Sequence, residues 1–340
     1  MSYGRIWPVH PHPLPDELLS SWIVRVARGN GIKLQTLTRM LFGTDRTPWN
    51  RDIDRSAPSW VLNAFSEHTG VPRPLLVRRT LRAYRGRLFS DVPLSGQLKW
   101  ILPVRSNGTK RAAFGMQFCP DCLATDEVPY FRKRWRVAFY TYCPVHQIEL
   151  YDACPACGSP VAHFRGDFNR ELNVALPMSS CHICGQDFRV TERHPVVIPC
   201  HRLHATFDRL LLSLHEGKPT PPIFDVEHLA VMHQLVRVMV MKSNSSRLLS
   251  YVAERVGLPV VELPPRRESV EERRRHERHY WSICGLWFMD DVDDHVREVW
   301  ETRRVLYNQL LRDFDGAPDW YLKFVDRLPH RRRLTGPVPR

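Results

Sequence analysis

The spacing of the cysteines constrains this chain more than any other feature. Eight potential metal ligands form four pairs with two residues between the members of each: Cys119/Cys122, Cys143/His146, Cys154/Cys157 and Cys181/Cys184. Pairs of this kind are typical of zinc sites, and two pairs complete the tetrahedral shell that Zn2+ prefers. In chain order, the first two pairs predict a site of three cysteines and one histidine. The last two pairs predict an all-cysteine site.

Other pairings remain open at the level of sequence. The second and third pairs could share one ion and leave the outer pairs to meet across the domain. His182 or His194 could replace a cysteine near the second site. Each arrangement gives every ion four protein ligands, so the two predicted zinc ions are structural and not catalytic. Cys200 and Cys284 have no such partner, and we expect them to be reduced thiols.

Outside the cysteine-rich centre, apolar residues recur at helical spacing. The stretches lie at 16–30, 34–41, 56–70, 72–84, 203–215, 226–241, 246–257 and 280–328. The sequence therefore predicts a mainly α chain with short β pieces near the cysteines. The segment 263–279 mixes arginine and glutamate densely, which predicts a linker that becomes a solvated helix.

A chain of 340 residues suits two or three domains, and the patterns divide it further. We expect a basic helical domain resembling a helix-turn-helix over 1–112 and a tandem zinc-finger module over 113–200. A helical domain over 201–262, a C-terminal helical block over 263–329 and a basic tail over 330–340 follow. The sequence contains no apolar run of about 18 residues and no secretory signal pattern, so we expect a cytoplasmic protein without a membrane span.

Positive charge is concentrated in one part of the N-terminal domain. The net charge is +13, and the segment 73–111 holds ten Lys/Arg against one acidic residue, a local excess of +9. Such an excess indicates a polyanionic partner such as nucleic acid. The predicted second helix of the helix-turn-helix carries several of these arginines. The residues expected to bind nucleic acid or an effector complex are Arg73, Arg78, Arg79, Arg82, Arg85 and Arg87; a solvated face of a helical bundle is the alternative.

A second basic cluster lies between the first two cysteine pairs. The segment YFRKRWRVAFYTY, 130–142, predicts an amphipathic helix whose apolar face packs against the protein. On the other face we expect Arg132, Lys133 and Arg134 to meet RNA, DNA or an acidic protein. A solvated basic face is the alternative here too.

The strongest candidate for catalysis is the acidic segment FMDDVDDHV. Its Asp290, Asp291, Asp293 and Asp294 could hold Mg2+ in a nuclease. They also suit the first turn of a helix, where the macrodipole favours acids, and we prefer that interpretation. No phosphate-binding loop, GxSxG or HExxH pattern is present, so we do not expect an enzyme.

Two stretches together resemble the TniQ family over about the first 200 residues. They are PVHPHPLPDELLSSWIVRVARGNG and the zinc region FCPDCL…YFRKRWRVAFYTYCPVHQIELYDACPACGSPV. The resemblance implies a non-catalytic adaptor that helps choose the target site in DNA transposition and passes that choice to an AAA+ ATPase, TnsC or TniB. The implied partners are that ATPase and a CRISPR Cascade-type effector with its guide RNA, with a homodimer possible.

Three alternatives to this adaptor remain open. The chain could select a DNA target directly, as the related TnsD proteins do, although it is shorter than typical TnsD. It could be a metal-dependent nuclease that uses the acidic segment. It could also be a zinc-containing transcription regulator.

Overall fold

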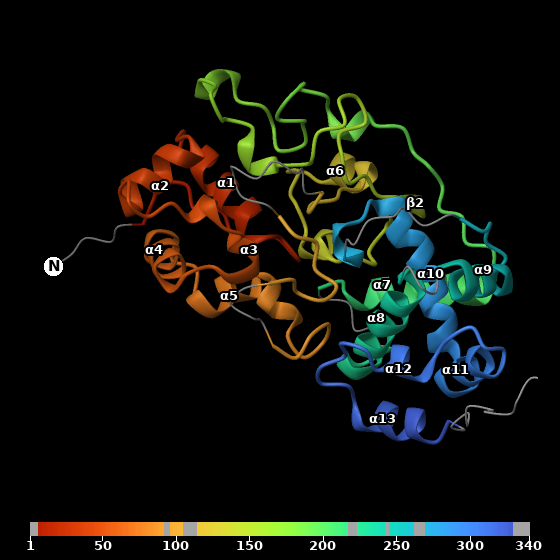
Figure 1. The fold of residues 1–340 in the computed structure, drawn as a ribbon. Coiled ribbons are helices and arrows are strands. Elements are labelled where there is room, and N and C mark those ends of the chain that lie inside the picture. The colour runs from red at the N-terminus through yellow and green to blue at the C-terminus, as the bar shows by residue number, and fades with distance from the viewer. Residues whose placement is uncertain are drawn as a thin grey trace, which may run out of the picture.

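Helices make up most of the regular structure of this chain. The computed structural model describes residues 6–91, 96–104, 114–216, 223–241, 245–261 and 269–328, and these hold thirteen α-helices (Figure 1). Within them the only strand pairing longer than a single bridge is antiparallel, between β1 (Tyr142–Cys143) and β2 (Ile148–Glu149). The prediction of a mainly α chain with short β pieces near the cysteines is confirmed.

The N-terminal part packs its helices around α1. Its α-helices are α1 (Leu19–Gly29), α2 (Leu34–Phe42), α3 (Ile53–Ser56), α4 (Ser59–Thr69) and α5 (Arg73–Arg78), with 3-10 turns η1 (Pro48–Asn50) and η2 (Leu81–Tyr84). α1 buries Leu19, Trp22 and Val26, whose three- and four-residue spacing predicts one apolar face. The helices expected at 16–30, 34–41 and 56–70 are therefore present.

The expected helix-turn-helix is present only with a short second helix. α4 ends at Thr69, the chain turns at Gly70, and α5 covers just six residues. The Thr80 hydroxyl then accepts a hydrogen bond from the backbone N–H of Arg82, a local bond that competes with helix continuation. The single helix predicted over 72–84 is therefore broken at Thr80.

The central part has little α-helix, and the helix predicted over 130–142 is wrong. It contains α6 (Pro120–Thr125) and the 3-10 turns η3 (Lys133–Arg136), η4 (His163–Arg165), η5 (Leu172–Val174) and η6 (Phe188–Val190). Around η3 the backbone bonds to distant segments. Lys133 N donates to Asp16 O at 2.8 Å, and Ala138 N donates to Trp100 O at 2.7 Å. These long-range bonds replace the ladder of an α-helix.

The C-terminal part is a set of helices around α10. Its elements are α7 (His201–Ser213), α8 (Val226–Val240), a π-helical turn η7 (Ser245–Leu249), α9 (Ser250–Val256), η8 (Val270–Glu272), α10 (Arg275–Asp290), α11 (Val292–Glu301), α12 (Tyr307–Leu310) and α13 (Asp319–Asp326). α10 packs against α7, α8 and α9 (Figure 1). Helices on both sides of the predicted boundary at 262 thus contact one another.

The solvated helix expected within 263–279 is wrong. Residues 262–268 lie outside the described part of the chain, as does the predicted tail 330–340. α10 begins at Arg275 and is largely buried, and the side chain of Arg278 has no exposed surface. The sequence mixes charges here because several of them pair with the central part, as described below.

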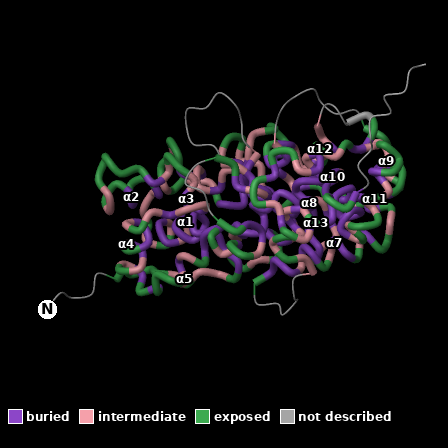
Figure 2. The backbone as a smooth tube through the Cα atoms, turned by 60° about the horizontal axis from the view of Figure 1, so that its bottom comes forward, coloured by how far each residue is buried: buried purple, intermediate pink, exposed green. Residues whose placement is uncertain are grey.

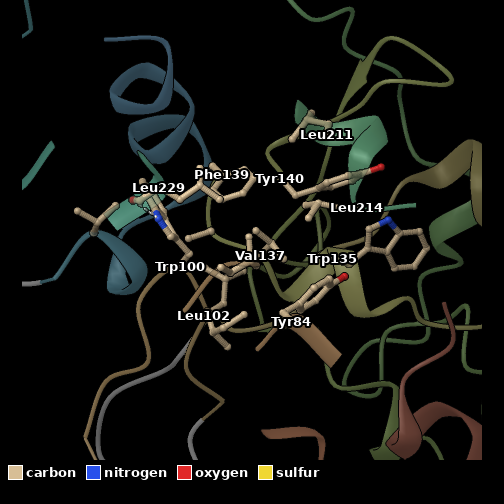
Figure 3. Close-up of a cluster of buried hydrophobic side chains, with 14 of the residues drawn as sticks. Tyr84, Trp100, Leu102, Trp135, Val137, Phe139, Tyr140, Leu211, Leu214 and Leu229 are labelled. Carbon is tan, nitrogen blue, oxygen red and sulfur yellow. Dashed lines mark hydrogen bonds between the residues drawn. The ribbon is translucent and has the colours of Figure 1, made fainter. Parts of the chain in front are cut away.

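One apolar core joins all three parts of the chain. Tyr84 and Trp100 come from the N-terminal part, Tyr140 comes from the centre, and Leu211 and Leu229 come from α7 and α8. All five are buried in the cluster of Figure 3. The indole Nε1 of Trp100 donates to the Leu229 carbonyl at 2.9 Å. Figure 2 shows buried backbone running from α1 to α10. The cysteine-rich region is therefore the middle of a continuous core.

Candidate metal centres and basic surface

The first cysteine cluster is buried between α6 and the β1–β2 hairpin. Cys119 caps α6, Cys122 lies in its first turn, Cys143 ends β1, and His146 lies in the turn to β2. Nδ1 of His146 is 3.5 Å from Sγ of Cys119, 3.5 Å from Sγ of Cys122 and 3.4 Å from Sγ of Cys143. The Sγ atoms of Cys122 and Cys143 are 3.8 Å apart.

These distances fit the edges of a zinc tetrahedron. Bonds of about 2.3 Å to sulfur and about 2.0 Å to nitrogen give S–S edges of about 3.8 Å and S–N edges of about 3.5 Å. The His146 ring presents Nδ1 to all three sulfurs, as a fourth ligand must. The cluster is thus shaped to hold one Zn2+ with no open position for water.

The second cluster has the same geometry and is more exposed. The Sγ atoms of Cys154 and Cys184 are 3.6 Å apart, and those of Cys157 and Cys181 are 3.7 Å apart. All four sulfurs lie within 4.8 Å of one another. Each pair is held in a tight turn that ends at a glycine with positive φ, 71° at 158 and 79° at 185, where other residues would be strained.

The structure groups all eight predicted ligands in chain order. The interleaved pairing is not formed, and neither His182 nor His194 belongs to either group. Both groups are compatible with zinc and offer four protein ligands each. A closed shell of this kind supports folding and leaves no site for a bound substrate.

An aspartate between the two clusters ties them to α10. The Asp152 carboxylate accepts bonds from Nη2 of Arg274 at 2.9 Å and from the backbone N–H of Arg275, the first residue of α10, at 2.6 Å. It also lies 3.7 Å from Nη2 of Arg278. Burial acts to raise the pKa of Asp152, but the hydrogen bond from Arg274 and the charge of Arg278 outweigh it and lower the pKa. Asp152 is therefore a buried anion that caps α10.

Arg278 completes this junction from the other side. Its Nη1 donates to the Ala138 carbonyl at 2.5 Å, Nη2 donates to Oε1 of Gln117 at 2.9 Å, and Nε donates to the Arg273 carbonyl at 2.9 Å. Burial lowers the pKa of Arg278 to about 10. Gln117 stands two residues before Cys119, and Asp152 two residues before Cys154. α10 thus contacts the chain just ahead of both metal groups.

The predicted nucleic-acid arginines of the N-terminal part fall into two classes. Arg79 is buried and grips Glu216 through both Nη atoms at 2.8 Å, and Arg87 donates through Nη2 to the Ser213 carbonyl. Both side chains hold the N-terminal part to the end of α7. Their charges are directed into the protein, contrary to the outward placement expected from the sequence.

The second class is exposed. Arg73, Arg78, Arg82 and Arg85 lie at the surface of α5, η2 and the residue after it. Arg85 pairs with Asp91 at 2.8 Å, whereas Arg78 and Arg82 form no ion pair with any described residue. We call these four residues the α5 surface. Their binding to nucleic acid or an effector stays a prediction.

The basic residues of η3 are also directed inward, contrary to expectation. All three are buried and paired with acids: Arg132 with Asp126 at 2.6 Å, Lys133 with Asp16 at 3.8 Å, and Arg134 with Asp16 at 2.7 Å. Burial lowers the pKa of Lys133. Without the predicted helix there is no outer face to carry these charges.

Sequence reasoning missed a buried polar network next to Arg136 of η3. The Ser20 hydroxyl donates to Oδ2 of Asp54 at 2.6 Å and lies 2.9 Å from Nε2 of His163. Burial, followed by the charge of Asp52, raises the pKa of Asp54 to about 6. Burial, followed by the charge of Arg136, lowers the pKa of His163 to about 3. These residue types also form hydrolase triads, but all three are closed to solvent, so the network is structural.

The acidic segment after α10 forms a helix start. The Asp291 side chain accepts the backbone N–H of Asp294 at 3.0 Å and so caps α11. Asp290 pairs with Arg202 at 2.8 Å, and Asp294 pairs with Arg297 at 3.1 Å. The carboxylates do not converge into a metal-binding group within the described residues. The preferred interpretation, a capped helix N-terminus, is confirmed.

The two remaining cysteines are free thiols. Cys284 is buried in α10, and its burial raises the pKa of the thiol. Cys200 is half-buried at the start of α7. Neither belongs to a metal-binding group among the described residues.

The geometry defines a helical protein with one buried and one partly exposed cysteine-rich group, each of which could hold a metal ion with four protein ligands. Residues 8–150 match the family model described as TniQ, so the chain carries a TniQ-family domain. The match covers the N-terminal helices and the whole first metal group, and the second group lies beyond it. No curated protein matches the chain. TniQ proteins are associated with transposition, in which they act as target-selection adaptors and are generally not catalytic.

None of the helices in the described part of the chain combines the length and the apolar character needed to cross a bilayer.

Proposed function

We propose that this chain is a non-catalytic target-selection adaptor in DNA transposition. It links a target-recognition complex to an AAA+ regulator of the TnsC/TniB kind, which recruits the transposase. The TniQ domain over residues 8–150 is the observation that carries this proposal. The two closed metal groups support it, because four protein ligands each leave no reactive position on a bound Zn2+.

The metal groups give the adaptor its rigidity. Zn2+ bound at each group would fix loops that contain little regular secondary structure and could not bury enough apolar surface alone. The contacts of α10 with the chain ahead of each group then make the C-terminal helices part of the same platform. A rigid platform suits a protein that must hold two partners at fixed positions.

The target-recognition complex is proposed to be an RNA-guided effector of the Cascade type. α5 spans six residues, about 9 Å of helix, which is short for an element that must reach several bases in a major groove. The α5 surface suits contacts to phosphates or to an acidic face better than base recognition. Direct DNA selection of the TnsD kind is the second candidate, and homodimerisation and a cytoplasmic location remain part of the proposal.

Affinity purification of the tagged chain from its native host tests the proposal. Mass spectrometry and RNA sequencing of the bound material should find an AAA+ ATPase, CRISPR effector proteins and a guide RNA. Target DNA with the ATPase but without guide RNA would favour direct selection.

A nuclease assay tests the alternative of an enzyme. Mg2+-dependent cleavage of DNA by the purified chain, abolished by Asp293→Asn, would overturn the adaptor. Regulation of a promoter without any ATPase partner would instead indicate a transcription regulator.

A further inference from the structure

A second exposed basic region lies on the loop that follows α2. The loop carries Arg46 and Arg51, both exposed, on either side of the half-buried Trp49. Neither arginine forms an ion pair with any described residue. Asp45 is the one acidic residue of the loop 43–51. The loop precedes the α5 surface in the sequence and was not indicated by the charge pattern.

Aromatic rings from two other segments contact this loop. Trp49 stacks on Phe164 of η4, with ring centroids 5.5 Å apart and planes at 15°. The guanidinium of Arg46 lies 5.8 Å from the ring centroid of Trp60 in α4. Trp60 and Phe164 are themselves half-buried. We call Arg46, Trp49, Arg51, Trp60 and Phe164 the tryptophan–arginine surface.

Partly exposed aromatic rings beside arginines that form no ion pair suit a particular ligand. Flat bases stack on aromatic rings, and arginines bind the phosphates between them, with little regard to sequence. In a duplex the base faces are covered by their neighbours, so only unpaired bases can stack in this way. An acidic peptide would satisfy the arginines but would leave the rings without a matching partner.

We propose that the tryptophan–arginine surface binds an unpaired nucleic-acid strand. This site is separate from the α5 surface and joins the TniQ domain to η4, which lies beyond the family match. In Figure 1 the two segments are α2 with its following loop and the green stretch after β2. The site is an activity in addition to the proposed adaptor function and does not depend on it.

Fluorescence anisotropy with the full-length, zinc-loaded chain tests this site. The probes are a labelled oligothymidine, an oligouridine, an abasic strand of the same length and a matched duplex. We expect the base-containing strands to bind at least about fivefold more tightly than the abasic strand, because each stacked base adds affinity. The oligothymidine and oligouridine arms show whether DNA or RNA is preferred.

Two variants connect the binding to named residues. Arg46→Ser combined with Arg51→Ser should reduce the slope of log K against log salt by about 1.4, since each phosphate contact on a single strand adds about 0.7. Trp49→Leu should weaken oligothymidine binding and leave abasic binding unchanged. Arg312→Ser combined with Arg327→Ser removes two exposed charges elsewhere and should change neither value.

Several results would overturn the site. In the Arg73→Ser, Arg78→Ser, Arg82→Ser triple variant, which lacks the charges of the α5 surface, equal affinity for the duplex and the single strand, or for the abasic and base-containing strands, would mean an ordinary basic surface. Effective competition by oligoglutamate would indicate an acidic protein partner. The Arg73→Ser, Arg78→Ser, Arg82→Ser triple variant should leave single-strand binding intact, so failure here is distinguishable from failure of the proposed function.

Discussion

The Asp152 junction gives the sharpest prediction on stability. Asp152→Asn keeps the shape of the side chain but removes the buried charge that faces Arg274, Arg278 and the first N–H of α10. Removing one partner of a buried ion pair leaves the other charges uncompensated and costs about 3–5 kcal/mol. The asparagine oxygen can still accept one hydrogen bond, so we expect about 3 kcal/mol, the lower end of that range.

Asp187→Asn, close to the second cysteine group, is a matched control variant. Asp187 also pairs with an arginine, Arg189, at 2.8 Å, but both side chains are substantially exposed. Asp187→Asn should therefore cost about 0–1 kcal/mol. Both variants remove one carboxylate charge close to the second cysteine group, so the difference between them isolates the effect of burial.

Two measurements check this pair of variants. Urea denaturation followed by circular dichroism gives the free energy of unfolding of each. Hydrogen exchange over residues 275–279 should accelerate in Asp152→Asn alone, because the N–H of Arg275 loses its carboxylate acceptor. If both variants lost the same stability, or if exchange at the start of α10 did not change, our assignment of Asp152 as the link between the centre and α10 would be refuted.

Three further predictions follow from the metal groups, the buried network and the arginine classes. Cys143→Ser should lower the zinc content from two ions per chain to one, measured by plasma mass spectrometry, and destabilise the core; an unchanged content of two would contradict the ligand assignment. In the buried network, the lowered folded pKa of His163 makes its contribution to the free energy of unfolding rise with pH between about 3 and 6.5. The raised folded pKa of Asp54 makes its contribution fall with pH between 3.8 and about 6. The loss of unfolding free energy caused by His163→Gln, measured by urea denaturation against the unsubstituted chain, should therefore change with pH between about 3 and 6.5; a difference that stayed constant across this range would contradict the assignment. The Arg73→Ser, Arg78→Ser, Arg82→Ser triple variant should lower the salt slope of duplex DNA binding by about 2.7. Arg79→Ser should instead destabilise the fold and leave that slope unchanged. The reverse pattern would place the DNA-binding charge at Arg79.

The parts of the fold that sequence predicted well depend on local spacing. A Cys-x-x-Cys turn places both sulfurs on one ion whatever surrounds it, and the apolar spacing of α1, α7 and α8 marks one face of each helix. The ligand groups and most helices could therefore be anticipated.

Apart from the helix break at Thr80, which follows from a local hydrogen bond, the failures depend on partners distant in the chain. At η3, the basic and aromatic residues follow helical spacing, but Asp16, more than a hundred residues away, pairs with Arg134 and draws this arginine inward. The start of α10, within the charged segment 263–279, was expected to be solvated, yet Asp152 holds it against the centre. The Ser20–Asp54–His163 network joins Ser20 to Asp54, 34 residues away, and to His163, 143 residues away, so no local sequence pattern indicates it.

The continuous core has a consequence for how such proteins diversify. The recognised family domain stops at residue 150, yet its Trp100 indole bonds to Leu229 and its Tyr140 hydroxyl lies 2.8 Å from Nε2 of His215. A relative that kept the domain but acquired a different continuation would have to supply new partners for both groups and a new apolar surface against them. Exchange of the C-terminal region at this boundary therefore costs folding stability. We expect C-terminal regions to change by gradual substitution more readily than by exchange of whole modules.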